Sequence, residues 1–183
     1  MVHSTPLNLA LKVLRHTFEQ TLAGQPPPTL AELLANAPDS LHQLGQKFQL
    51  LPFEQGILLL CAALELEPNF QTLCAEVQGN PKATYATLSL ALALFPEADW
   101  SVLSSQSPLH HWQLIHTEAG RWLAHAPLQL DRRILCYLLG TPDLAAPLVP
   151  WLTPLPRPSD TLPLSPTYQA LSQQIVTLWS GAA

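Results

Sequence analysis

The chain has 183 residues, a net charge of −5 and only 11% charged residues, whereas a typical globular domain carries about 25%. Its 48% apolar content is enough to form a core, which excludes an intrinsically disordered chain. The longest apolar run, residues 56–64, is far shorter than the roughly 20 residues that span a bilayer, and the negative charge argues against a general nucleic-acid binder.

The N-terminal part is predicted to form short helices. Thr5 and Pro6 are typical N-cap and first-turn residues, and leucines follow at helical spacing, so we expect a helix over residues 5–22. Residues 29–32 form a capping box that begins a second helix, and a third short helix runs through Phe48.

The central block predicts a helix-turn-helix arrangement. Pro52 starts a helix that is apolar on all sides from Ile57 to Leu64 and is therefore expected to be buried, and Pro68 starts a shorter one. In residues 84–95 leucines alternate as they would in a strand. The alanines and leucines there are strong helix formers, so we predict a helix.

Two alternating segments, residues 112–116 and 122–126, flank a four-residue turn that contains glycine and predict a β-hairpin. We expect Trp112 and Trp122 to pack across it as an aromatic pair. A hairpin that follows three helices is the layout of a winged helix. The predicted fold is therefore a mainly α domain with a winged-helix-like core and one small β-hairpin.

Asp131 is expected to begin a further helix over residues 132–139, which ends at Gly140. Prolines then become frequent from Pro142 onward and predict an extended linker. A last amphipathic helix follows, with an apolar stripe made of Tyr168, Leu171, Ile175 and Leu178.

These patterns divide the chain into an N-terminal helical segment (1–45), a winged-helix-like domain (46–141) and a proline-rich linker with a terminal helix (142–183). The N-terminus lacks the basic start and apolar block of a secretory signal. The three cysteines are widely spaced, which is typical of reduced thiols rather than of a disulfide framework. We therefore expect a cytoplasmic protein.

The sequence contains no catalytic motif: GxxxxGK[ST], HExxH and CxxC are all missing. A metal-dependent enzyme is an alternative because four histidines gather near the predicted hairpin: His110, His111, His116 and His125. Their spacing matches no zinc-binding pattern, and neither cysteines nor a cluster of acidic residues support a site. We predict no catalytic, cofactor-binding or metal-binding residue in this chain.

A nucleic-acid-binding winged helix is a second alternative, because Lys82, Thr84, Tyr85 and Thr87 lie near the start of the predicted recognition helix. Lys82 is the only basic residue between positions 52 and 95, against four glutamates, which gives a local charge of −3 (one minus four). Duplex affinity depends mainly on phosphate neutralisation. We therefore favour a protein partner and name these candidate partner-binding residues: Lys82, Trp100, Trp151 and Trp179.

Four stretches resemble the N-terminal, winged-helix-like region that precedes the ATPase module in a group of bacterial AAA-type ATPases. They are FQLLPFEQGILLLCAALEL (48–66), the helix at 84–94, SPLHHWQLI (107–115) and, most specifically, LQLDRRILCYLLG (128–140). The likeness covers residues 46–150, with the order and spacing preserved. The family's arginine-rich turn is reduced to Lys82 here, which weakens a nucleic-acid role further.

The resemblance implies a non-catalytic interaction or regulatory domain whose parent couples ATP binding and hydrolysis to the remodelling of a partner. ATP and magnesium would be bound by the following module and not by this chain. The resemblance also implies that the parent forms a homo-oligomeric ring, that it does not enter a membrane, and that this domain contacts another protein or its own AAA module.

Overall fold

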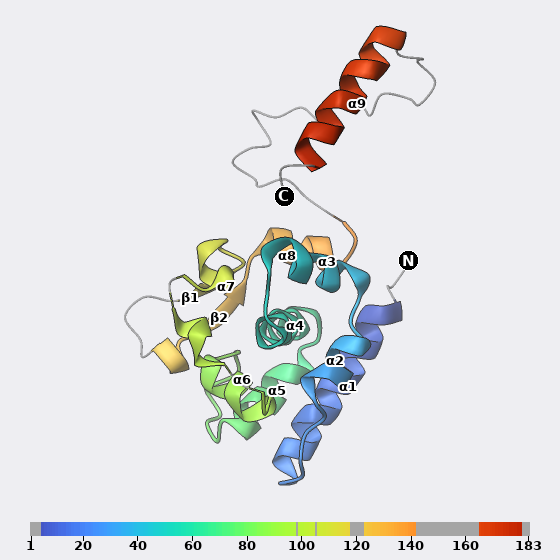
Figure 1. The fold of residues 1–183 in the computed structure, drawn as a ribbon. Helices are drawn as coiled ribbons and strands as arrows, with labels where there is room; N and C mark the ends of the chain where they lie inside the picture. The colour runs from blue at the N-terminus through green and yellow to red at the C-terminus, as the bar shows by residue number, and fades with distance from the viewer. Residues whose placement is uncertain (1–4, 98, 105, 118–122, 142–164, 181–183) are drawn as a thin grey trace. The chain divides into compact units, whose positions relative to one another are not determined.

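The computed structural model describes residues 5–97, 99–104, 106–117, 123–141 and 165–180. It divides into two compact units, Met1–Leu144 and Ala145–Ala183. The described helices of the first unit and its one hairpin are shown in Figure 1: α1 (Thr5–Leu22), α2 (Leu30–Ala35), α3 (Asp39–Phe48), α4 (Pro52–Leu66), α5 (Asn69–Val77), α6 (Leu88–Leu94), α7 (Pro108–His111), β1 (Ile115–Thr117), β2 (Leu128–Leu130) and α8 (Arg132–Leu138). The prediction of a mainly α fold with one small hairpin is confirmed.

Helix α4 forms the centre of the first unit and is surrounded by the other elements (Figure 1). Its residues from Gly56 to Ala63 are all buried, as expected for a helix that is apolar on every side. A side chain at Gly56 would meet Leu30 at 2.8 Å and the Phe95 ring at 3.2 Å. Glycine therefore lets α2 and the end of α6 approach the central helix closely.

The predicted helix starts in the N-terminal part are confirmed. Helix α1 begins at Thr5, and Thr29 caps α2 because its hydroxyl accepts a hydrogen bond from the Glu32 amide at 3.3 Å. Arg15 of α1 forms an ion pair with Glu67, the C-cap residue of α4. The helices of residues 1–45 pack into the same hydrophobic core as α4 and α5.

The segment predicted as a helix over 84–95 is helical, but α6 begins only at Leu88. The prediction of its start was wrong because Thr87 is the N-cap: its hydroxyl accepts a hydrogen bond from the Leu90 amide at 3.0 Å. Lys82, Thr84 and Tyr85 consequently lie in the loop before the helix and not on its first turn.

The hairpin exists, but its second strand is not where the alternation placed it. Strand β1 pairs antiparallel with β2 in the register Ile115↔Leu130, His116↔Gln129 and Thr117↔Leu128. Within the predicted strand 122–126, residues 123–125 form a 3-10 turn. Strand β2 lies further on because it is also held by a long-range contact, the Leu128 amide donating to the Ala86 carbonyl at 2.9 Å.

Trp112 was expected in the first strand, but it follows α7 as its C-cap residue. Its ring contacts Phe48, with 5.6 Å between the centroids. Trp122, the partner expected from the sequence, lies outside the described residues. The aromatic pair therefore joins α7 to α3 and does not cross the hairpin.

Helix α8 begins after Asp131 and is followed by Gly140 at φ 76°, so the predicted N-cap and terminal glycine are confirmed. In the second unit, α9 (Pro166–Ser180) is the predicted terminal helix. Its apolar residues Tyr168, Leu171 and Ile175 are exposed. The predicted linker, residues 142–164, lies outside the described residues, and none of the described helices has the length and apolar character needed to span a membrane.

Candidate functional site

The loop between α5 and α6 is held by one glutamine. The Gln78 side-chain amide donates to the carbonyls of Ala83 at 2.9 Å and Tyr85 at 3.1 Å. Its oxygen accepts a hydrogen bond from the Thr87 hydroxyl at 2.9 Å, and Thr87 in turn caps α6. This network holds the loop between Gln78 and Thr87, and α6 begins directly after it at Leu88.

A hollow of about 370 Å³ opens beside this loop. Its polar lining includes Gln78, Tyr85, Thr87, Ser89 and His125, so it is bordered by α5, α6 and the 3-10 turn before β2. The hydrogen bond from β2 to the Ala86 carbonyl joins the hairpin to the same loop. Helix α5, the loop, α6 and the hairpin therefore form one connected unit, the arrangement of a helix-turn-helix with a wing.

A model of the winged helix domain, variant, matches residues 10–152. The chain belongs to this winged helix domain family. The match starts within α1, so this winged helix domain includes the N-terminal helices as well as α4, α5, α6 and the hairpin. No curated protein and no solved structure matches the chain.

In this winged helix domain, the helix in the recognition position has almost no polar surface. Helix α6 has the sequence LSLALAL, and Leu88, Leu90, Ala91 and Leu94 are buried. Its exposed residue is Ala93, and Ser89 and Leu92 are half-buried. Base-edge recognition requires donors and acceptors on the outward face of such a helix, and α6 carries no charged or amide side chain.

The charges around the helix-turn-helix are also unfavourable for a phosphate backbone. Two of its four glutamates are engaged, because Glu54 is buried and hydrogen-bonded and Glu67 pairs with Arg15. The other two, Glu65 and Glu76, are exposed, against the single exposed cation Lys82. The described surface of this region is therefore acidic.

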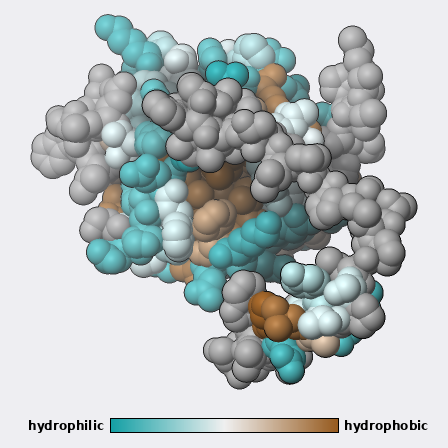
Figure 2. All heavy atoms as spheres, turned by 90° about the horizontal axis from the view of Figure 1, so that it is seen from above, coloured by the Kyte–Doolittle hydropathy of each residue, from teal (hydrophilic) through white to brown (hydrophobic). Residues whose placement is uncertain are grey.

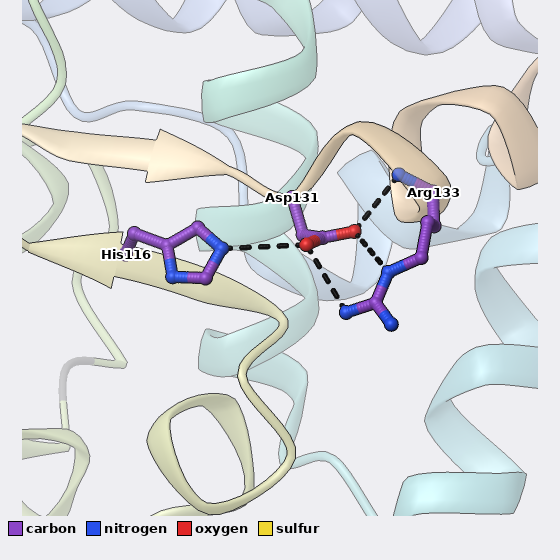
Figure 3. A network of polar contacts seen from close by, with 3 residues as sticks. All are labelled: His116, Asp131 and Arg133. Carbon is purple, nitrogen blue, oxygen red and sulfur yellow. Dashed lines mark hydrogen bonds and ion pairs between the residues drawn. The ribbon is translucent and has the colours of Figure 1, made fainter. Parts of the chain in front are cut away.

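The base of the wing is tied to α8 by a polar network (Figure 3). One oxygen of Asp131 accepts hydrogen bonds from the Arg133 amide and from its Nε, both at 2.8 Å. His116 Nε2 on β1 lies 3.3 Å from the other oxygen. The hydrogen bonds from Arg133 lower the pKa of Asp131 to about 2, so the carboxylate remains charged and holds both the helix start and the strand.

A second link joins α4 to α7 through a buried carboxylate. Glu54 is 1% exposed, and it accepts hydrogen bonds from the Leu51 amide at 2.9 Å and the Ser107 hydroxyl at 2.7 Å. Burial lowers the pKa of the neighbouring His110, an effect that the charge of Glu54 opposes. Glu54 also lies in the first turn of α4, where the helix dipole favours a negative charge.

The predicted partner-binding residues that the structure describes are on separate elements. Lys82 is exposed on the α5–α6 loop, and Trp100, 61% exposed, begins a 3-10 turn at Trp100–Leu103. Trp151 lies outside the described residues. Trp179 lies in α9, and its side chain is also outside the description. The described part of the chain holds no group of three or more His, Cys, Asp or Glu side chains placed to bind a metal.

Sequence reasoning missed one exposed aromatic group. Trp112 is 53% exposed, and its ring contacts both Phe48 and His111, the latter with 4.9 Å between the centroids. The alternating pattern had assigned Trp112 to the hairpin. The contact with Phe48 is long-range in sequence, so only the folded chain reveals it.

Proposed function

We propose that this chain is a non-catalytic protein-interaction or regulatory domain. The observation that carries the proposal is the outward face of α6, which has no basic, amide or aromatic side chain in the recognition position of a winged helix. Fold does not fix function, and a winged helix without a basic recognition surface is suited to contacts with proteins.

We further propose that the parent is an AAA-type ATPase that works as a homo-oligomeric ring in the cytoplasm. The support for this is the resemblance of residues 46–150 to the region that precedes the AAA module in such enzymes. In this proposal ATP and magnesium bind the following module, and the domain described here selects the partner or regulates the ring. The chain contributes no catalytic residue.

A DNA titration tests the choice between the two kinds of partner. The chain is titrated with a mixed-sequence duplex at about 50 mM and about 200 mM salt, conditions between which true phosphate contacts lose much of their affinity. We expect no binding at either concentration. Binding at low salt that weakens at high salt and is lost in Lys82→Glu would overturn the proposal in favour of a nucleic-acid-binding winged helix.

Calorimetry with Mg-ATP tests the non-catalytic assignment. We expect no heat of binding for the chain alone. Saturable binding of Mg-ATP would show that the chain has a nucleotide site of its own and would contradict the proposal.

A further inference from the structure

The ends of three helices come together around the exposed aromatic pair. Trp112 ends α7 and contacts Phe48, the last residue of α3. Asp131, the N-cap of α8, donates its amide to the Leu114 carbonyl at 3.0 Å. Leu114 is two positions after Trp112 in the chain, so the start of α8 lies near Trp112. We name this area the Phe48–Trp112 surface and define it by five residues: Lys47, Phe48, Leu51, Trp112 and Arg132.

Large apolar side chains are exposed on this surface. Leu51 is 44% exposed and Trp112 53% exposed, while Phe48 is half-buried beneath the indole. Figure 2, which looks from above relative to Figure 1, shows hydrophobic residues between hydrophilic ones on the face that it draws. Tryptophan anchors that are surrounded by polar residues are typical of binding hot spots.

The helix that carries each aromatic residue ends in the left-handed backbone conformation. Gln49 and Gln113 are the two non-glycine residues with positive φ among those described, each at 53°, and they directly follow Phe48 and Trp112. Glycine is the usual residue at such positions. Both glutamines belong to helix C-terminal caps, because the next amide donates back into the helix: Leu50 to the Gly45 carbonyl and Leu114 to the Leu109 carbonyl, both at 2.9 Å.

The charges on this surface are positive, in contrast to the chain as a whole. Lys47 and Arg132 are exposed, and Lys47 Nζ lies 5.8 Å from the centroid of the Tyr137 ring. The nearby acid Asp131 is already engaged by Arg133 and His116. A complementary partner must therefore offer negative charge around an apolar anchor.

We propose that the Phe48–Trp112 surface binds a short segment of a partner protein that combines aspartate or glutamate with leucine or an aromatic residue. The proposal rests on the proposed function, because it assumes a protein partner. It adds the place of contact and the chemistry of the segment. The anchor would pack on Trp112 and Phe48, and the acidic residues would face Lys47 and Arg132.

The experiment selects short random peptides displayed on phage against the full 183-residue chain. The enriched peptides are then synthesised, labelled and titrated by fluorescence anisotropy. We expect them to combine acidic residues with leucine or aromatic residues. Trp112→Ala should weaken their binding by about 30-fold, the effect of losing a hot-spot residue. Lys47→Glu gives up the contact of Lys47 Nζ with the Tyr137 ring, and it should weaken binding by about tenfold because it places a like charge opposite the acidic peptide.

Trp100→Ala is the matched control, because Trp100 is another exposed tryptophan on a different element, and it should leave binding unchanged. The proposal is overturned if the enriched peptides are basic, if Trp112→Ala and Lys47→Glu bind them as tightly as the wild type, or if nothing is enriched. It is also overturned if Trp112 instead mediates a dimer of the chain or binds single-stranded oligonucleotides. Peptides that bind through another surface would refute this inference and leave a protein-interaction function standing.

Discussion

The buried Glu54 carboxylate offers a sharp test of how the domain is held together. It accepts a hydrogen bond from the Leu51 amide ahead of α4 and one from the Ser107 hydroxyl ahead of α7. Replacing it with alanine removes both acceptors at once. The Leu51 amide and the Ser107 hydroxyl then lose their acceptor. Ser107 is only 6% exposed, so water cannot easily replace the lost bond.

The cost follows from these two contacts. A buried donor left without a partner costs about 1–3 kcal/mol, so Glu54→Ala should lower the free energy of unfolding by about 3 kcal/mol. Glu54→Gln keeps the shape but turns an amide NH2 toward one donor, and it should cost about half as much. Ser107→Ala leaves the carboxylate one of its two partners, and should cost about 2 kcal/mol.

Urea unfolding followed by far-UV circular dichroism and by tryptophan fluorescence measures these values, with coincident transitions as the check for two-state behaviour. Because Glu54 and Ser107 share a bond, their double variant should cost about 1.5 kcal/mol less than the sum of the two single changes. Purely additive effects, or a Glu54→Ala variant within about 0.5 kcal/mol of the wild type, would refute the assignment of this contact as a link between α4 and α7.

Three further predictions concern other described residues. The hydrogen bonds that lower the pKa of Asp131 also stabilise the fold. This stabilisation is complete above the unfolded pKa of about 3.9 and is lost as the pH falls through the folded pKa of about 2. Measurements of the free energy of unfolding against pH should show this loss in the wild type and not in Asp131→Asn. Burial raises the pKa of Cys61 and of Cys74 to about 12. Iodoacetamide at about pH 8 should therefore alkylate the half-buried Cys136 first. Equal alkylation rates for the three cysteines of the folded chain, followed by mass spectrometry, would contradict this. Gln113→Gly should raise the free energy of unfolding by about 0.5–1 kcal/mol, because glycine adopts φ 53° without strain; a loss of stability in urea unfolding would show that the glutamine side chain matters.

Much of the helical framework could be predicted from the sequence because its signals are local. The Thr29 cap, the proline at the start of α4 and the glycine after α8 act on residues within one turn of themselves. The burial of α4 followed from its uninterrupted apolar run. Where a residue's conformation is set by neighbours in sequence, the prediction was confirmed.

The errors arise where a distant residue decides the local structure. The start of α6 depends on Gln78, whose side-chain amide holds the loop before it. The position of β2 depends on Ala86, to which its first residue is hydrogen-bonded. Neither contact leaves a periodic pattern, so alternation and helix propensity alone placed both elements several residues too early.

The same reasoning explains why the proposed binding surface was not found from the sequence. Tryptophan alone is ambiguous, because an exposed ring and a core ring look identical in a sequence. Trp112 became a candidate only when two features were seen together: its exposed ring lies against Phe48, and the cations Lys47 and Arg132 are exposed nearby. Trp100 is more exposed, yet no aromatic ring in the described part of the chain stacks with it, and its 3-10 turn contains no basic residue. Exposure alone therefore does not select a binding residue here. The difference in peptide affinity between Trp112→Ala and Trp100→Ala measures how much the nearby charge and the ring contact add to binding.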